Sequence, residues 1–147
     1  MIVRTAEILD IPECLRIGRM FCEESNWGWE FNEDNALRSF YTAITHDDMD
    51  IIGVFDKDNM VGIAIVSKEN DFTTEALGDI IEFYVCKEFR KTTCARDLLN
   101  RVCEWFDNKG CKNVFVKSTG NVDGQSKVFE NLFKKFGFNV FSSVLVR

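Results

Sequence analysis

Residues 81–99 read IEFYVCKEFRKTTCARDLL, and this stretch decides the fold. Its first five residues are mostly β-branched or aromatic, which predicts the end of a strand. A loop of small and basic residues follows, and that loop opens a helix. Because the first turn of a helix leaves backbone N–H groups unpaired at its positive end, such a turn suits a phosphate ligand. We therefore predict an anion-binding turn that Arg90, Lys91 and Arg96 reinforce.

On both sides of this stretch, hydrophobic patterns predict further elements without a repeat or a linker. Asp10 and Glu13 have the spacing of a capping box for the first helix. The predicted elements are a strand at 2–5, helices that begin at Asp10 and Glu33, strands at 51–55, 60–67 and 77–86, a helix at 93–109, a strand at 114–116, a helix that begins at Ser126 and a strand at 138–146. This order, β-α-α-β-β-β-α-β-α-β, predicts one α+β domain over residues 1–147, with a parallel crossover after strand 77–86.

The composition is that of a globular protein, with 46% hydrophobic residues and 14 Phe. A chain of this size buries roughly 68–70% of its unfolded surface, so neither a metal nor a disulfide is required to hold it. The first residues lack the basic start and apolar run of a signal peptide, and no apolar stretch approaches the ~20 residues that span a bilayer. A cytoplasmic protein without a membrane partner is the expectation.

The six cysteines are expected to be free and mostly buried thiols. No two of them form the close pair of a zinc site, and the chain has one His. A disulfide framework belongs to shorter, loop-rich secreted chains. An unpaired Cys behaves as a small hydrophobic residue, which suits these positions. We therefore predict no metal site.

The net charge of −6 is unevenly distributed. Between Glu23 and Asp50 there are eight acids and one base, a local charge of −7, and we call these acids the acidic block. The segment 87–96 is basic. One acidic and one basic region indicate two ligands of opposite sign, although an acidic stretch can also serve only as solvated surface. The basic residues are too few to neutralise a track of nucleic-acid phosphates, so DNA binding is not expected.

Three spaced motifs resemble those of the GNAT superfamily of acetyltransferases. The stretch 85–99 resembles the acyl-CoA-binding motif, in which a strand ending in Val leads through a glycine-rich loop into a helix that opens with two leucines. The residues that match in register are Val85, Phe89, Arg90, Ala95, Leu98 and Leu99. Residues 54–62 resemble the family's hairpin, with its glycine on the second arm, and residues 132–138 resemble the Leu-Tyr-x-x-x-Gly-Phe signature. The resemblance covers essentially the whole chain.

This resemblance implies a three-layer α/β/α sandwich around a mixed β-sheet, and an N-acetyltransferase that uses acetyl-CoA as co-substrate. It implies that acetyl-CoA is bound by residues at the end of the strand, in the loop and at the start of the last helix. These are Tyr84, Val85, Arg90, Lys91, Thr92, Thr93, Cys94, Ala95, Arg96 and Ser126. The resemblance leaves open whether the chain forms a homodimer.

The chain departs from the family pattern at several positions. Lys91 and Thr93 stand where the loop has glycines, and Phe133 replaces the Tyr that often protonates the leaving thiolate. Glycine allows a close approach of the backbone, which is harder for Thr. These departures favour a second reading, a weak or inactive GNAT-fold module that acts through CoA or protein binding. A different type of nucleotide-phosphate binder would need a glycine-rich loop, and the chain has none.

The mechanism that the resemblance implies is direct attack of a neutral amine on the thioester in a ternary complex. A base must take a proton from the amine first, and the predicted base is Glu82, with Asp79 second. A bulge in this strand would bring both carboxylates toward the cleft. The backbone N–H of Val85 is the expected donor to the oxyanion, and Tyr84 is the best-placed phenol to act as acid. The alternatives are an outward-facing Glu82 and a Tyr84 that only packs.

The loop between the first two helices walls the acceptor pocket in this family. Here it contains Trp27, Trp29 and Glu30. Aromatic faces attract cations, and nearby carboxylates add to the attraction. The predicted acceptor is therefore a cationic primary amine, either a small molecule or a protein side chain. The alternative is that the two Trp residues only cap the core.

Overall fold

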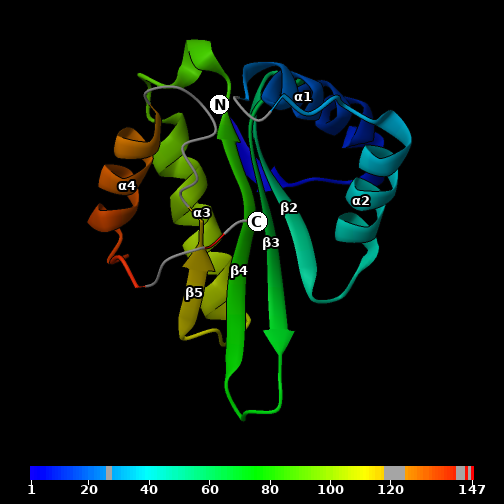
Figure 1. The fold of residues 1–147 in the computed structure, drawn as a ribbon. Helices are drawn as coiled ribbons and strands as arrows, with labels where there is room; N and C mark the ends of the chain where they lie inside the picture. The colour runs from blue at the N-terminus through cyan, green and yellow to red at the C-terminus, as the bar shows by residue number, and fades with distance from the viewer. Residues whose placement is uncertain (26–27, 118–124, 142–144, 146) are drawn as a thin grey trace.

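A computed structural model gives the structure of the chain, and it describes residues 1–25, 28–117, 125–141, 145 and 147 (Figure 1). Within these ranges the helices and strands follow the predicted order up to the last helix. The elements are β1 (Ile2–Thr5), the 3-10 turn η1 (Ile8–Asp10), α1 (Ile11–Glu24), α2 (Glu33–Thr45), β2 (Met49–Asp56), β3 (Asn59–Asn70), β4 (Ala76–Val85), the 3-10 turn η2 (Lys87–Phe89), α3 (Cys94–Asn108), β5 (Asn113–Val116) and α4 (Gln125–Lys135).

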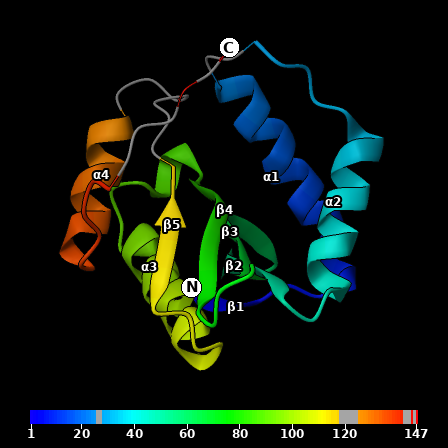
Figure 2. The ribbon, with the colours of Figure 1, turned by 60° about the horizontal axis from the view of Figure 1, so that its bottom comes forward.

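The strands form one mixed sheet in the order β1-β2-β3-β4-β5. The first four pair antiparallel, and β5 pairs parallel to β4, as the predicted crossover through α3 requires. Helices α1 and α2 cover one face of the sheet, and α3 and α4 cover the other (Figure 2). The α+β class and the three-layer arrangement are therefore confirmed.

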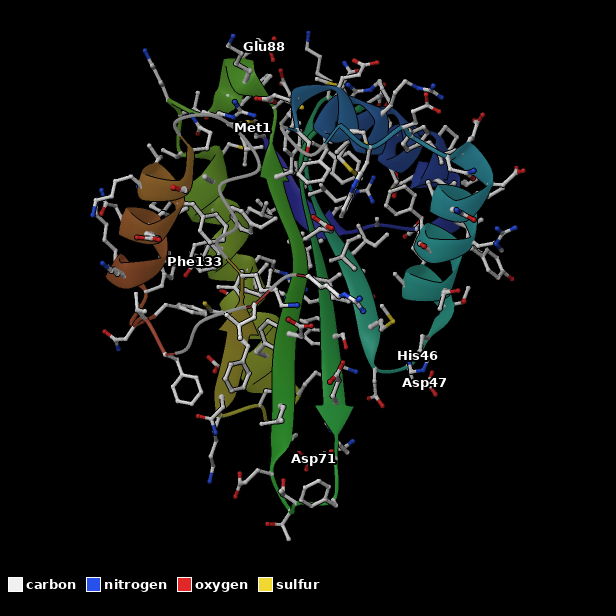
Figure 3. The ribbon with its side chains drawn as sticks, in the orientation of Figure 1. Met1, His46, Asp47, Asp71, Glu88 and Phe133 are labelled. Carbon is white, nitrogen blue, oxygen red and sulfur yellow. The ribbon has the colours of Figure 1, made fainter. Side chains whose placement is uncertain are left out.

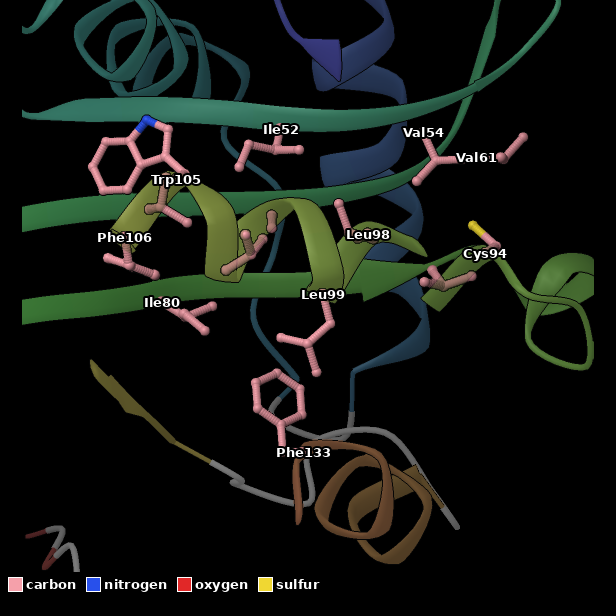
Figure 4. Close-up of a cluster of buried hydrophobic side chains, with 14 of the residues drawn as sticks. Ile52, Val54, Val61, Ile80, Cys94, Leu98, Leu99, Trp105, Phe106 and Phe133 are labelled. Carbon is pink, nitrogen blue, oxygen red and sulfur yellow. The ribbon is translucent and has the colours of Figure 1, made fainter. Parts of the chain in front are cut away.

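Each face of the sheet packs its own hydrophobic core, because side chains alternate between the faces along a strand. One core joins the sheet to α3 and α4, and it includes Ile52, Leu98, Phe106 and Phe133 (Figure 4). The other joins the sheet to α1 and α2. Its largest buried members are Phe40, Phe55, Met60 and Tyr84. All six cysteines are free, and Cys14, Cys86, Cys94 and Cys111 are buried, as predicted.

The predicted capping box at the start of the first helix is wrong. Asp10 does not cap α1 with its side chain. Its carboxylate instead accepts hydrogen bonds from the Glu7 backbone N–H at 2.7 Å and from the Arg4 guanidinium at 2.7 and 3.0 Å. Glu13 accepts from the Met60 backbone N–H at 2.8 Å. Both carboxylates therefore tie α1 to the sheet, because tertiary partners compete with the local capping pattern.

The described part of the segment 138–146 forms no strand, contrary to the prediction. Gly137 turns the chain with a φ of 87°. The Phe138 backbone N–H then donates to the Phe133 carbonyl at 3.2 Å, and the two rings lie edge to face at 5.0 Å. Phe138 thus packs against the end of α4. Residues 142–144 and 146, also in the predicted strand, lie outside the described residues.

A glycine in β4 allows α3 to approach the sheet closely. A Cβ atom on Gly78 would lie 2.6 Å from two ring atoms of Phe106 and 3.1 Å from Val114 Cγ2. We expect Gly78→Ala to destabilise the fold by about 1–3 kcal/mol, measured by urea unfolding, because overpacked cores must shift side chains and backbone.

Gly62→Ala is the matched control for Gly78→Ala. Gly62 is also a strand glycine, but a Cβ there would meet its nearest neighbour, Cys94 Sγ, at 3.2 Å, so the loss should be smaller. In a Phe106→Leu background, which lacks the obstructing ring, Gly78→Ala should cost less stability than it does in the wild type. Equal unfolding midpoints for Gly78→Ala and the wild type would contradict the steric account.

Candidate active site

β5 pairs with only the first half of β4 and then ends, which leaves a gap beside the second half of β4. The last pairing of β5 with β4 joins Val116 to Ile80. β4 continues beyond that point to Val85, so this part of its edge has no strand partner within the described residues. In Figure 1, β5 accordingly stops beside the middle of β4. A cavity of about 350 Å³ lies at this gap.

The cavity is lined by both helical layers. Phe21 and Cys22 of α1, together with Trp29, line it on one side of the sheet. Ala95 of α3 and Phe129 of α4 line it on the other. The cavity therefore passes through the gap that β5 leaves beside β4, and two ligands could reach each other there from opposite faces.

A bulge in β4 sets which side chains face each layer. Glu82 pairs with Ile65 and Ile80 with Val66, so Ile81 is the extra residue. In a regular strand Asp79 and Glu82, three positions apart, would point to opposite faces. The bulge puts both on the face that α1 and α2 cover, together with Tyr84. The structure thus contains the bulge that the sequence analysis invoked.

Glu82 is exposed, but the surface it exposes belongs to the cavity wall. The surrounding protein removes part of the water around its carboxyl, and this desolvation raises its pKa above the ordinary value of a Glu. No described side chain donates a hydrogen bond to it or forms an ion pair with it. Its charge also contributes, after burial, to raising the pKa of the Cys22 thiol across the cavity. Glu82 is therefore an unpaired carboxylate in the cavity.

Asp79 occupies a different position from Glu82. It stands opposite Ser67 of β3 and Phe115 of β5, where all three strands are still paired, and it does not line the cavity. Burial and, secondly, the nearby Glu69 raise its pKa. The bulge therefore gives the two carboxylates a common face, but only Glu82 reaches the gap.

The backbone N–H of Val85 points toward the gap. The Cys86 N–H donates to the Val61 carbonyl at 2.9 Å, so Val61 and Cys86 form a hydrogen-bonded pair. Such pairs alternate along an antiparallel ladder, and the next pair, Gly62 with Val85, is not hydrogen-bonded. The N–H and C=O groups of Val85 consequently face away from β3. Among the described residues, the Val85 N–H therefore has no acceptor, which is compatible with the expected role as donor to the oxyanion.

The loop after β4 offers further backbone donors. The Thr92 hydroxyl donates to the Phe89 carbonyl at 2.6 Å and accepts from the Cys94 N–H at 3.2 Å. Within residues 90–96, the N–H groups that have no acceptor among the described residues are those of Lys91, Thr93, Ala95 and Arg96. Thr92 therefore holds the turn that glycines usually form. The donors left over lie at the positive end of α3.

The basic side chains of the loop do not all face outward. Arg90 forms an ion pair with Glu24 at 2.6 Å and is mostly buried. Arg96 pairs with its neighbour Asp97 at 3.0 Å on the surface, and such exposed pairs are weak. Lys91 is exposed. Of the predicted phosphate-binding side chains, Lys91 and Arg96 thus remain accessible, whereas Arg90 has a structural partner.

Tyr84 is buried, and its ring lies edge to face with Phe21 at 5.7 Å. Its hydroxyl donates to Glu24 Oε1 at 2.7 Å. Burial first, and then this hydrogen bond, raise the pKa of Tyr84 above its ordinary value. The predicted role as a proton donor to the thiolate would require the bond to Glu24 to break.

The acidic block is divided by α2. Asp47, Asp48 and Asp50 lie beyond the end of this helix, and the other five acids lie near its start. With 13 residues, α2 is about 20 Å long. Figure 3 shows Asp47 far from Glu88, which follows the end of β4. Asp50 also accepts a hydrogen bond from Trp105 Nε1 at 2.7 Å. The expectation of one continuous acidic region is therefore wrong.

The predicted acceptor residues are only partly brought to the cavity. Trp29 lines it and remains 66% exposed. Glu30 is exposed but does not line it. Trp27 lies outside the described residues. On the opposite wall, Ser126 lines the cavity from the first turn of α4.

The sequence analysis did not single out several residues that line the cavity, nor the carboxylate that connects β4 with the loop after it. Phe21 and Cys22 line the cavity from α1, and Glu24 binds both Tyr84 and Arg90. The helical periodicity assigns Phe21 and Cys22 to the inner face of their helix, but it does not distinguish a core position from a cavity wall. Glu24 is one acid among eight in its block. Only the long-range contact identifies it.

The sequence of residues 15–138 matches the Acetyltransferase (GNAT) family. The chain therefore belongs to this family, and it is an acetyl-CoA-dependent N-acetyltransferase. No curated protein matches the chain by sequence. No helix in the described ranges is long and apolar enough to cross a bilayer.

Solved structures share the fold at low sequence identity. An integron cassette protein from the mobile metagenome of Cole Harbour Salt Marsh has 22% identity and a TM-score of 0.80, over 99% of this chain and 88% of that one. The acetyltransferase AAC(6′)-Iy, bound to the bisubstrate analogue CoA-S-monomethyl-acetylneamine, has 15% identity and a TM-score of 0.79, over 99% and 95%. The aminoglycoside 6′-N-acetyltransferase AAC(6′)-IG from Acinetobacter haemolyticus has 12% identity and a TM-score of 0.75, over 100% and 97%.

Proposed function

We propose that the chain acetylates a cationic primary amine by direct attack on the thioester of acetyl-CoA. The observation that carries this proposal is the cavity between β4 and β5. Glu82 is on its α1 side, and the start of α3 is on its other side. An acceptor that enters over α1 and an acetyl-CoA held by α3 would meet at the end of β4, where the Val85 N–H faces the gap.

In this proposal Glu82 removes a proton from the acceptor ammonium, directly or through a water, and the neutral amine then attacks the thioester carbon and displaces the CoA thiolate. A base works best when its pKa lies near the operating pH, and desolvation moves the pKa of Glu82 in that direction. Asp79 is the second choice because β5 still covers it. The Val85 N–H stabilises the oxyanion as the thioester carbonyl is attacked.

Acetyl-CoA is held by its phosphates at the start of α3. The four unpaired N–H groups of the loop form a nest for an anion, and Lys91 and Arg96 add positive charge. Ser126 faces the same cavity from α4. Arg90 lines the cavity, but its guanidinium is held in the ion pair with Glu24, so we assign it to the loop rather than to a phosphate.

The acceptor side carries aromatic and acidic groups. Trp29 lines the cavity. Four acids lie at the end of α1, in the loop that follows it and at the start of α2, namely Glu23, Glu30, Glu33 and Asp34. The solved structures of aminoglycoside acetyltransferases also support a polycationic small molecule as acceptor. We therefore expect small amines that carry a second positive charge to be better substrates than monoamines whose only charge is the reacting amine.

A panel of amines assayed at low and high salt tests this acceptor class. Thiol release from saturating acetyl-CoA would be followed, so that the salt dependence of CoA binding does not contribute. We expect kcat/KM for dications to fall about 3–10-fold as salt rises, because the Debye length shrinks from about 10 Å at 0.1 M to about 3 Å at 1 M. A neutral-bodied monoamine of similar size is the control and should change little. An anionic best substrate, or a rate that rises with salt for cations, would contradict the electrostatic part of the proposal.

A further inference from the structure

Glu24, the last residue of α1, joins three elements at the reacting end of β4. Its Oε1 accepts from the Tyr84 hydroxyl at 2.7 Å and from Arg90 Nη2 at 2.6 Å. Its Oε2 accepts from Arg90 Nη1 at 2.6 Å. The Glu24 and Arg90 side chains are only 26% and 17% exposed. One carboxylate thus binds the strand and the loop at the same time.

Arg90 extends this connection to the backbone of Val85. Its Nε donates to the Val85 carbonyl at 3.0 Å, while its two terminal nitrogens hold Glu24. The planar guanidinium has its donors in a fixed fork, so the three bonds set one orientation. The carbonyl that Arg90 fixes belongs to the peptide directly after Val85, and Tyr84 is the residue directly before it.

We propose that Glu24 is a positioning residue that orients the Val85 peptide N–H for the oxyanion of the acetyl-transfer step. It acts through Tyr84 on one side of Val85 and through Arg90 on the other. This inference rests on the role proposed above for the Val85 N–H. It also gives Arg90 a function that differs from phosphate binding, although the sequence motif places it in the CoA loop.

The physical reason is that this end of β4 lacks support on one edge. β3 holds the residues on either side of Val85 through the ladder, but the edge that faces the gap has no strand partner in the described ranges. A backbone donor stabilises an oxyanion only when it is already aimed at the place where the charge develops. The Glu24–Arg90 pair supplies on that edge the hydrogen bond that a neighbouring strand would otherwise provide.

Glu24→Gln tests the proposal with Glu23→Gln as the matched control. Both variants remove one negative charge from the same end of α1, but Glu23 is exposed and has no partner among the described residues. The control therefore measures the long-range effect of the lost charge. We expect kcat to fall about 10–100-fold further in Glu24→Gln than in Glu23→Gln, since losing an oxyanion donor outright costs about 10²–10³-fold. The Kd of acetyl-CoA, measured by calorimetry, should change less than about threefold.

A double-mutant cycle separates positioning from proton donation by Tyr84. If Tyr84 acts through Glu24, adding Tyr84→Phe to Glu24→Gln should lower kcat by less than about threefold more. A further loss of tenfold or more would instead assign Tyr84 to proton transfer, and it would overturn the part of the proposal in which Glu24 acts through Tyr84. If Glu24→Gln lowers the affinity for acetyl-CoA as many-fold as it lowers kcat, and also lowers the melting temperature, Glu24 is only a structural support.

An amide resonance gives a readout that does not depend on the acceptor. We expect the backbone amide signal of Val85 to shift or broaden in Glu24→Gln and to stay in place in Glu23→Gln. An unmoved signal, with a kcat equal to that of the control, overturns the proposal. The wild type could fail to acetylate any amine on the panel while the Val85 signal still responds to Glu24→Gln. That result would count against the proposed acceptor and would support the positioning role of Glu24.

Discussion

Glu82→Gln should lower kcat about 10²–10⁴-fold, the usual contribution of a positioned general base. The amide keeps the shape of the side chain and cannot take a proton at neutral pH. The Kd of acetyl-CoA, measured by calorimetry, should hardly change, because Glu82 faces the α1 side of the gap. Asp79→Asn is the matched control, since Asp79 lies on the same face of β4 but under the cover of β5. A near-normal rate in Glu82→Gln together with a dead Asp79→Asn would move the role of base to Asp79.

The pH dependence of the wild type provides a second test of Glu82. The base works in its ionised form, and desolvation raises its pKa. The wild-type rate should therefore rise with pH, with an apparent pKa above the ordinary Glu pKa of about 4.3. The Gln variant should not show this rise.

Glu82→Gln should lower the rate but should not lower the stability of the fold. The folded pKa of Glu82 is raised, so the unfolded chain gives up this proton more easily. Folding stability from this group is then lost as pH rises from the unfolded pKa through the folded one. Glu82→Gln should consequently melt at or above the wild-type temperature at pH 7. A marked fall in melting temperature would mean that Glu82 is a structural residue.

Phe133→Ala should destabilise the fold by about 3–5 kcal/mol, as buried Phe→Ala substitutions do. Phe133 is 2% exposed and points from α4 into the core beneath α3 (Figure 4). Its ring stacks on Phe129 at 4.2 Å and meets Phe83 and Phe138 edge to face at 5.2 and 5.0 Å. Removing it leaves a cavity at the one place where α4 is anchored to the sheet by a fully buried side chain within the described residues.

Phe72→Ala is the control for Phe133→Ala, because Phe72 lies in the β3–β4 turn and is fully exposed. It should change the free energy of unfolding, measured with urea, by no more than about 0.5 kcal/mol. A loss below about 1 kcal/mol for Phe133→Ala would mean that α4 does not depend on this ring. The site would then need another account of how its α4 wall, including Phe129, is held.

The sequence predicted the order of the elements because each has a strong local signal. The helix that begins at Glu33 was predicted from its helical spacing, and α2 begins at the same residue. The helix after the basic loop was predicted from leucines and aromatics at three- and four-residue spacing, and Leu98, Leu99 and Phe106 are indeed buried. The motifs in 54–62, 85–99 and 132–138 were enough to indicate the family. Periodicity and spacing along the chain carry this information.

The sequence was less reliable where two patterns compete. Asp10 and Glu13 fit a capping box, yet Arg4 and the Met60 N–H engage them instead. Residues 138–141 look like the start of a strand, yet Phe138 finds a better contact against Phe133. A local pattern predicts its element only if no residue elsewhere in the fold makes more favourable contacts with the same groups.

The chain by itself thus determined a GNAT-type α+β domain, a strand–loop–helix suited to phosphate, and a short set of carboxylates in β4. The tertiary structure decided which of them face the site. The bulge at Ile81 turns Glu82 to the same face as Asp79, and the early end of β5 leaves only Glu82 at the gap. The fold also divides the acidic block along α2 and takes Arg90 and Tyr84 into the contacts of Glu24. The physical reason is that strand register and contacts across 60 or more residues depend on the packing of whole layers, and no window of sequence contains them.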